Sequence, residues 1–297
     1  MRISTAQTYD RSLSSMKELS ANADKLQGQI ASGKRVVNAS DDAGSYARLT
    51  QLKRGAAATT ADTANLDLAK TLVAQSDSTL GSIETQLQRA KELAIQGNTG
   101  TVSPEQRKVL GTELNAILDD IVSLANSKDL RGQPLFGGAT SAAPFARDAS
   151  GTVQWQGTGT AAKIPVGEAG EIQANDSGER LFTAAGGGAD IFAAVQAIAE
   201  SFGEGEPLSD SSLAALDTSL DQIATARASF GARGARLDLE GQRLDDLKVD
   251  RDAERAGLEG IDTEGAIIEL QRTITVLQAT QASFSKLTSL SLFDYLR

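Results

Sequence analysis

Residues 28–34 read GQIASGK, which matches the first seven positions of the phosphate-binding loop GxxxxGK. That loop needs Ser or Thr at its next position as a magnesium ligand, and it follows a strand. Arg35 stands at the next position instead, and the residues before it follow a helical pattern. The glycines of 157–159 are similar to part of a dinucleotide fingerprint, but Pro165 follows and no long helix begins there. We therefore expect a helix end at the first site and a turn at the second.

Asp41 and Asp42 are the other candidates for a reactive site, because adjacent carboxylates could act as metal ligands or as an acid and base pair. The chain contains no His and no Cys. Zinc sites built on these residues, disulfides and nucleophile–His dyads are therefore excluded. A helix start explains the pair more simply, with Ser40 as the N-cap and both aspartates in the first turn. We predict no catalytic site, no metal and no cofactor.

The composition narrows the class of protein further. The 297 residues carry a net charge of -10, and phosphate neutralisation needs clustered Lys and Arg, so nucleic acid is not an expected partner. Only 4% of the residues are aromatic, so burial must come from Leu, Ile and Ala in helical seams. The N-terminal residues contain no apolar run that could form a signal peptide or a membrane span, so we expect no membrane insertion.

Both ends of the chain have apolar residues at alternating spacings of three and four, which predicts one long helix at each end. The N-terminal stripe is predicted to end at Gly33, a plausible position just past a helix C-terminus. The two stripes are Met16, Leu19, Ala23, Leu26 and Ile30, and then Ile267, Leu270, Ile274, Leu277 and Phe284.

Three further long helices are expected between these ends. A seam runs from Leu66 to Ala94, and a capping box of Ser103 and Gln106 starts a helix antiparallel to it. The third has an apolar residue every seven positions, at Leu216, Ile223, Phe230, Leu237, Leu244 and Leu258. The charged stretch 250–260 is expected to be a hinge or a loosened segment.

The middle of the chain, 131–190, is rich in Gly, Ala, Thr and Pro and has no helical period. Strands are predicted around 153–155, 163–166 and 171–173, with the only Trp in the core of that region, and a short helix follows at 191–202. The predicted fold is mainly α with an inserted β-rich domain. Its long antiparallel helices form a coiled-coil-like bundle, and the N- and C-termini lie side by side.

We divide the chain into three predicted domains. The terminal helical assembly domain comprises 1–39 and 256–297, the central helical bundle comprises 40–130 and 206–255, and the β-rich outer domain comprises 131–205. The narrow terminal stripes could pack on the chain's own central helices. Alternatively, they stay partly uncovered in the monomer and become ordered on neighbouring subunits.

Several stretches resemble the bacterial flagellin superfamily. GKRVVNASDDAGSYARL (33–49) and LQRAKELAIQGNTGTVSPEQR (87–107) resemble its N-terminal signature and the helix and turn that follow. Three other stretches are similar to the branch that joins the flagellar hook to the filament. They are MRISTAQ at the start, ANSKDLRGQPLFGGATSAAPF (125–145) and SLFDYL (291–296). Pro134 and Gly44 depart from the family pattern, where an aromatic and a small apolar residue are usual.

This resemblance implies a structural protein, not an enzyme, exported through the flagellar channel by the type III apparatus without a cleaved signal peptide and located extracellularly in the flagellum. It implies self-association in a ring, contact with hook-associated protein 1 and with flagellin, and an export chaperone on the C-terminal helix. The alternatives are a filament-forming flagellin and a module whose outer domain binds a surface ligand. The expected assembly residues are Leu13, Met16, Leu19, Leu26, Ile30, Ile267, Ile274, Leu277, Phe284, Leu290, Leu292, Phe293 and Leu296.

Overall fold

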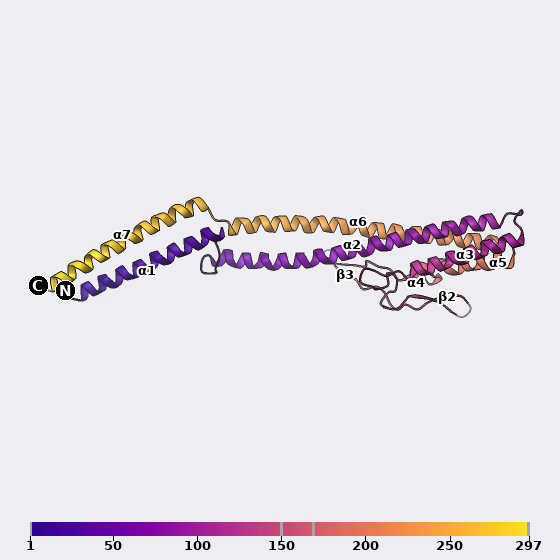
Figure 1. Ribbon diagram of the computed structural model, residues 1–297, viewed down its shortest axis with the longest axis horizontal. Coiled ribbons are helices and arrows are strands. Elements are labelled where there is room, and N and C mark those ends of the chain that lie inside the picture. The colour runs from indigo at the N-terminus through magenta and orange to yellow at the C-terminus, as the bar shows by residue number, and fades with distance from the viewer. Residues whose placement is uncertain (1, 149–150, 168–169, 296–297) are drawn as a thin grey trace. The chain divides into compact units, whose positions relative to one another are not determined.

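The structure is a computed structural model that describes residues 2–148, 151–167 and 170–295. It is mainly helical, as predicted, with a few short antiparallel strands in the inserted region (Figure 1). In chain order the elements are α1 (Arg2–Ser32), α2 (Ala43–Gly97), α3 (Pro104–Ala125), β1 (Phe145–Arg147), β2 (Val153–Trp155), β3 (Ile164–Pro165), β4 (Glu171–Ile172), α4 (Gly178–Phe182), the 3₁₀ turn η2 (Ala184–Gly186), α5 (Ile191–Glu204), α6 (Asp210–Glu259) and α7 (Thr263–Tyr295).

The backbone contacts divide the chain into two compact units. One unit comprises residues 1–57 and 246–297, and the other comprises residues 58–245. The helices α2 and α6 each contribute to both. The three-domain division expected from the sequence stays a prediction, because these units are defined by contacts and not by independent folding.

The core of the larger unit lies between α2 and α6, and it uses the predicted heptad positions. Leu216, Ile223, Phe230 and Leu237 are all fully buried along α6. The α2 positions that face the core are also buried and include Leu66, Ala69, Val73, Leu80, Ile83, Leu87, Ala90 and Ala94. Ion pairs flank this seam, such as Lys70 Nζ with Asp238 at 2.8 Å and Lys91 Nζ with Asp217 at 2.6 Å. The seven-residue repeat therefore buries a continuous apolar stripe.

The helices α3 and α5 complete this bundle at very close range. Ser103 caps α3, and its side chain and that of Gln106 form the predicted capping box. A Cβ on Gly111 would lie 2.9 Å from the Ala199 carbonyl oxygen, so only glycine lets α3 approach α5 this closely. The predicted helix at 191–202 is confirmed as α5.

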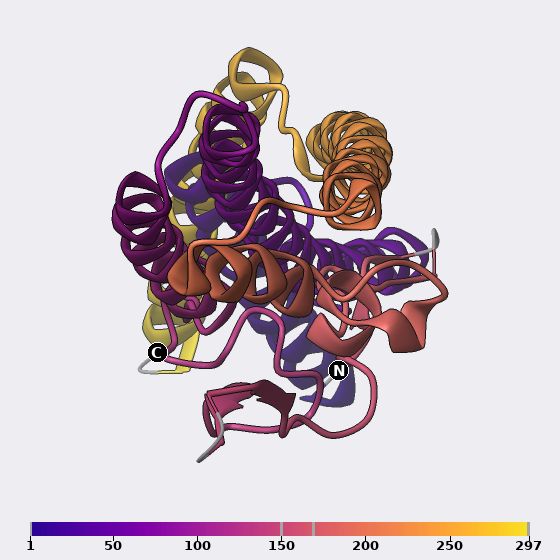
Figure 2. The same cartoon turned by 90° about the vertical axis from the view of Figure 1, so that its right-hand side faces the viewer.

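The inserted segment forms two separate two-stranded antiparallel sheets, β1 with β2 and β3 with β4. In the end-on view of Figure 2 both sheets lie outside the helices and not between them. The expectation that Trp155 fills the core is wrong, because Trp155 is only half-buried. Phe145 takes that place, with its ring centroid 4.9 Å from that of Phe192 and 5.7 Å from that of Phe182. The strand β1 that carries Phe145 was not predicted.

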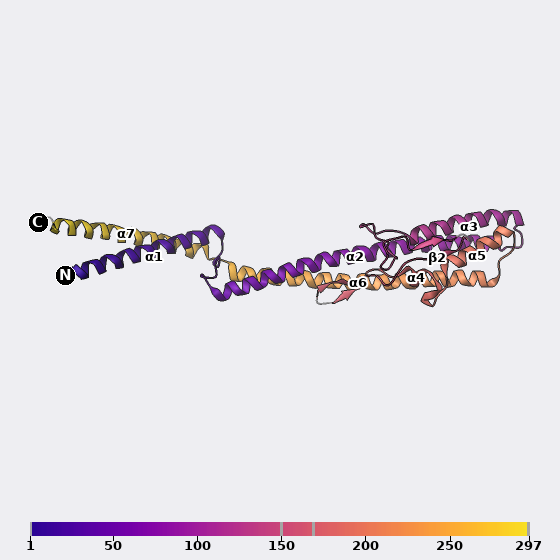
Figure 3. The ribbon, with the colours of Figure 1, turned by 90° about the horizontal axis from the view of Figure 1, so that it is seen from below.

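In the smaller unit, α1 and α7 lie antiparallel and side by side (Figures 1 and 3). Lys34 is bridged to Gly260 at one end, and the rings of Tyr9 and Phe284 are 4.5 Å apart toward the other. As predicted, α1 ends just before Gly33, whose φ of 67° is the left-handed conformation favoured by glycine.

Two local predictions in this unit are wrong. The stretch 250–260 was expected to be loosened, but α6 continues through Glu259, because Arg48 of α2 forms an ion pair with Glu254 at 2.6 Å and Arg251 donates to the Gly55 carbonyl. The helix α2 begins at Ala43, and its N-cap is Asp42 and not Ser40. The Asp42 carboxylate accepts from the backbone N–H of Ser45 at 3.0 Å, which is the usual N-cap hydrogen bond.

Candidate assembly surface

The contact between α1 and α7 is a two-helix seam with strict heptad spacing. On each helix, the side chains that are half-buried or buried recur in steps of three and four. On α1 these positions are Ser12, Met16, Leu19, Ala23, Leu26 and Ile30, with Gln29 also buried beside Ile30, and on α7 they are Ala266, Leu270, Thr273, Leu277, Thr280 and Phe284. Among the side chains described on these two helices, none that is apolar is buried, and the buried ones are Gln29 and Thr273. The seam is therefore thin, in the sense that no described apolar side chain in it is fully shielded from water.

The structure divides the predicted assembly residues into two sets. Met16, Leu19, Leu26, Ile30, Leu277 and Phe284 lie in the seam, where each helix faces the other. Leu13, Ile267 and Ile274 lie outside it and are 42%, 41% and 39% exposed. We call these three residues the outward set. The predicted single stripe on α7 therefore divides into a seam face and a more exposed flank.

The remaining predicted assembly residues are near the C-terminus. Leu290, Leu292 and Phe293 belong to the last turns of α7, where only the backbone is described, and Leu296 lies outside the described residues. Their role in assembly stays a prediction.

A polar clasp holds the end of α1 against the start of α2 and the end of α6. Arg35 is its centre: its backbone N–H donates to the Glu259 carbonyl at 2.7 Å, and its guanidinium reaches Asp42 at 3.4 Å and the Leu258 carbonyl at 3.3 Å. Lys34 adds an ion pair with Glu259 at 3.0 Å. The contacts with Leu258 and Glu259 join residues more than two hundred positions apart, so sequence spacing alone could not predict them.

The two aspartates of the clasp accept hydrogen bonds from backbone N–H groups. The backbone N–H groups of Asn38 and Val37 donate to the Asp41 carboxylate, which also pairs with Lys25 at 3.0 Å. The Asn38 N–H and these other donors lower the pKa of Asp41 to about 2. The Ser45 hydroxyl, the Ser45 N–H and Arg35 lower the pKa of Asp42 to about 2 as well. Both carboxylates are therefore fixed as anions that order the turn.

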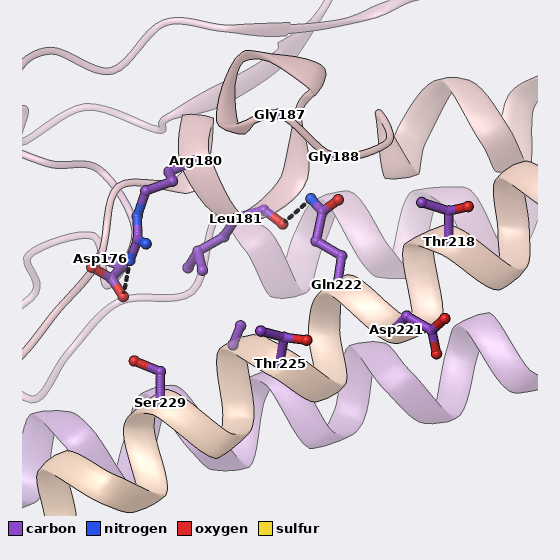
Figure 4. A pocket seen from close by; sticks show the side chains of 11 residues that line it. Asp176, Arg180, Leu181, Gly187, Gly188, Thr218, Asp221, Gln222, Thr225 and Ser229 are labelled. Carbon is purple, nitrogen blue, oxygen red and sulfur yellow. Dashed lines mark hydrogen bonds and ion pairs between the residues drawn. The ribbon is translucent and has the colours of Figure 1, made fainter.

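A concave site lies on α6 in the larger unit, beside α4 and the loop after it (Figure 4). The polar groups that converge there are bonded to the chain itself. Gln222 donates to the Leu181 carbonyl and accepts from the Ala189 N–H, both at 2.8 Å, and Asp176 pairs with Arg180 and Arg233. This arrangement fastens the inserted segment to α6.

Over residues 2–148, 151–167 and 170–295, no three carboxylates lie close enough together to hold a metal ion. No helix in the described part of the chain combines the length and apolar character needed to cross a membrane.

Comparison with known proteins points to one family. The bacterial flagellin N-terminal helical region matches residues 3–141, and the bacterial flagellin C-terminal helical region matches residues 213–296. Flagellar hook-associated protein 3 of Escherichia coli (strain K12) is 26% identical over 99% of both chains. A flagellin of Listeria monocytogenes is 24% identical over 89% of this chain and 86% of its own.

Solved structures agree with this assignment at the level of the fold. A flagellar hook-associated protein from Vibrio parahaemolyticus has a TM-score of 0.67 at 23% identity and covers 74% of this chain and 100% of its own. The flagellar junction protein from Legionella pneumophila has a TM-score of 0.60 at 16% identity over 71% of this chain and 99% of its own. The two flagellin regions together span most of the sequence, and the chain belongs to the bacterial flagellin family.

Proposed function

We propose that this chain is a structural subunit of the bacterial flagellum at the junction between hook and filament. The observation that carries the proposal is the end-to-end similarity to hook-associated protein 3, which leaves almost none of either chain unmatched. The flagellins that match cover less of both chains. The thin seam between α1 and α7, whose described side chains include no buried apolar residue, suits a role in assembly.

The outward set supplies the contact with neighbouring copies, and the seam residues pair α1 with α7 within one chain. Leu13, Ile267 and Ile274 expose apolar surface that water solvates unfavourably, at about 25 cal/mol per Å². Burial of this surface between subunits stabilises a ring and contributes nothing in the isolated chain. Leu290, Leu292, Phe293 and Leu296 extend this contact in the same proposal.

The partners follow from this position in the flagellum. Hook-associated protein 1 contacts the ring on the hook side, and flagellin contacts it on the filament side. The subunit leaves the cell through the flagellar channel, with an export chaperone covering α7 beforehand. Uncovered apolar residues on a terminal helix are the type of surface that such a chaperone shields.

Deletion of the gene tests the junction role directly. We expect the deletion strain to be non-motile and to release flagellin into the medium, and we expect the wild-type gene to restore attached filaments. Purified chains that elongate on seeds into long filaments would instead support the alternative, a filament-forming flagellin. A deletion strain that swims with normal filaments would contradict both roles.

The outward set is tested in the same strain with the double substitution Ile267→Ser and Ile274→Ser. We expect the free energy of unfolding of the monomer to change by less than about 0.5 kcal/mol, because neither residue packs in the seam. Motility should nevertheless be lost. The matched control is Gln278→Ser, an exposed polar residue one turn further along α7, which should restore motility fully.

A further inference from the structure

The loop that follows α3 presents a single leucine to solvent. Leu130 is 87% exposed, more than any other large apolar side chain that the structure describes. Water solvates such a surface unfavourably, at about 25 cal/mol per Å² of apolar area. Single exposed apolar residues are nevertheless common on protein surfaces, so a role for Leu130 needs further observations.

The first of these observations is that the loop is held firmly around the leucine. The Asp129 carboxylate is almost fully buried and accepts from the backbone N–H groups of Arg131 at 2.8 Å and Gln133 at 2.9 Å. The Arg131 guanidinium also donates to it at 3.0 Å. Lys128 is bridged to Pro134 across the base of the loop. A side chain on so ordered a loop loses little backbone freedom when it binds, which is the property of a preorganised anchor.

The second observation is an apolar groove in the same unit, between the start of α5 and the start of α6. It has a volume of about 460 Å³, and six of the ten residues that line it are alanines. Ala193 and Ala197 share one face of α5, and Ala215 lines the groove from α6. We call this site the alanine groove. Because alanine side chains are short, the groove has room for an apolar side chain from another molecule.

The loop and the alanine groove are also complementary in charge. Lys128 is exposed next to the leucine, and the charge of Arg131 is balanced by Asp129, so the tip of the loop is positive. Asp190 lines the groove, and Asp210 is exposed at the first position of α6 beside it. None of the ten lining residues is basic. Opposite charges of this kind steer two surfaces together and fix their orientation.

The leucine cannot fill the groove of its own chain, because the two lie far apart along the bundle. The loop is fixed to α2 where the Gln75 side chain donates to the Lys128 carbonyl at 2.9 Å. Two positions further along α2, Asp77 pairs with Arg227 of α6 at 3.1 Å. Ala215 is twelve positions from Arg227 on α6, which is about 18 Å at the helical rise per residue. An occupant of the groove must therefore come from another molecule.

We propose that Leu130 of one copy docks in the alanine groove of a second copy when the subunits lie side by side. This inference rests on the proposed function, because it needs copies of the chain in contact. The two patches differ, so each copy offers its leucine to one neighbour and its groove to another. Such a heterologous contact builds a ring or a helix and not a closed dimer. It lies in the larger unit and is separate from the outward set on α1 and α7.

Disulfide cross-linking tests this contact without background, because the chain contains no cysteine. Leu130→Cys and Ala193→Cys are combined in one chain and produced in the deletion strain. The isolated flagella are then oxidised, and the chain is followed on a non-reducing gel. We expect a ladder of dimers, trimers and larger multiples. The matched control combines Leu130→Cys with Ala224→Cys, an exposed alanine two and a half turns beyond Ala215 and hence on the opposite side of α6. It should stay monomeric.

Three results of this experiment would overturn the inference. They are a double variant that stays monomeric, a dimer formed by Leu130→Cys alone, which would mean a contact between like patches, and cross-linked bands that contain a different protein. The same oxidation of the purified chain at high concentration gives the answer if the double variant does not assemble in the cell.

Substitution of the leucine itself supplies a second measurement. Leu130→Ser removes the apolar tip and should abolish motility, while the free energy of unfolding of the monomer changes by less than about 0.5 kcal/mol. Leu130→Met keeps an apolar tip of similar size and should restore motility. Full motility with Leu130→Ser would contradict the inference and leave the proposed function intact. If the wild-type gene itself does not restore motility, the proposed function fails, and cross-linking of the purified chain still decides whether Leu130 meets the groove.

Discussion

The α1–α7 pair and the α2–α6 seam share the same heptad spacing but differ in what they bury. Along α6 the heptad positions are Leu, Ile, Phe, Leu and Leu, all almost completely shielded from water. Along α7 the equivalent positions include Ala266, Thr273 and Thr280, and the leucines between them are only half-buried. Periodicity therefore gives the geometry of a helix pair, whereas residue size and the number of neighbouring helices decide its stability.

The two helix pairs differ in burial because the central bundle has further helices beside α2 and α6. The central bundle also contains α3 and α5, whose buried residues cover faces that a two-helix pair leaves in water. The terminal pair has no such cover among the described residues, and its clasp at the base is polar and largely exposed. Exposed ion pairs contribute little to stability, about 0–1 kcal/mol each. We therefore expect the two regions to respond differently to the same kind of substitution.

The largest expected effect is for Phe230→Ala in the central seam. Phe230 is fully buried, so its truncation should lower the free energy of unfolding by about 3–5 kcal/mol. The equivalent truncation in the terminal pair, Leu270→Ala, should cost about 1 kcal/mol, because Leu270 is half-buried. Urea unfolding followed by circular dichroism measures both. Equal losses would mean that the terminal pair is as firmly packed as the bundle.

A smaller effect is expected from adding one methyl group. A Cβ on Gly97 would lie 2.2 Å from the Phe202 ring, so Gly97→Ala should destabilise the bundle by about 1–3 kcal/mol. A Cβ on Gly28 of α1 has no atom within 4 Å, so Gly28→Ala should stabilise that helix by about 0.5–1 kcal/mol. Thermal unfolding measures the change in stability of each variant. If Gly97→Ala were stabilising, the bundle would have space for a methyl group beside Phe202.

The smallest expected effect is the acid sensitivity of the clasp. The pKa of Asp41 and that of Asp42 are lowered from 3.8 to about 2 in the folded chain. Their contribution to stability is therefore complete above about pH 4 and is lost as the pH falls toward 2. In limited proteolysis, pepsin should therefore cleave the segment 33–42 faster as the pH falls from about 4 toward 2.

Asp41→Asn tests the assignment, because an amide at this position no longer titrates. This variant should show weaker pH dependence of cleavage at 33–42, while Asp24→Asn on the exposed face of α1 should behave as wild type does. Identical pH profiles for all three proteins would show that Asp41 does not stabilise the turn.

Much of the fold could be predicted from local patterns. The capping box at Ser103, the helix end at Gly33 and the buried heptad of α6 all depend on residues close together in sequence, and all three are confirmed. The helix at 250–259 was missed because its stability comes from Arg48 and Gly55 on another helix. The strand β1 was missed because Phe145 is its only residue with a strong strand preference, whereas the equally short β2 has both Val153 and Trp155.

The candidate surface could be predicted only in part. Spacing alone located the apolar residues on α7, but Ile267, Leu270 and Ile274 follow each other so closely around the helix that one broad stripe fits them all. Which of them faces α1 depends on how α7 is rotated against its partner, and the sequence does not contain that angle explicitly. Thr273 was overlooked because a polar residue is not expected at a covered position.

Amide hydrogen exchange of the dilute wild-type monomer tests the central claim most directly, since it reads the terminal pair and the bundle in one experiment. The thin seam between α1 and α7 predicts fast exchange over about the first 35 and the last 40 residues, and slow exchange along residues 66–94 and 216–244. Termini that are protected as strongly as the central bundle would contradict this account.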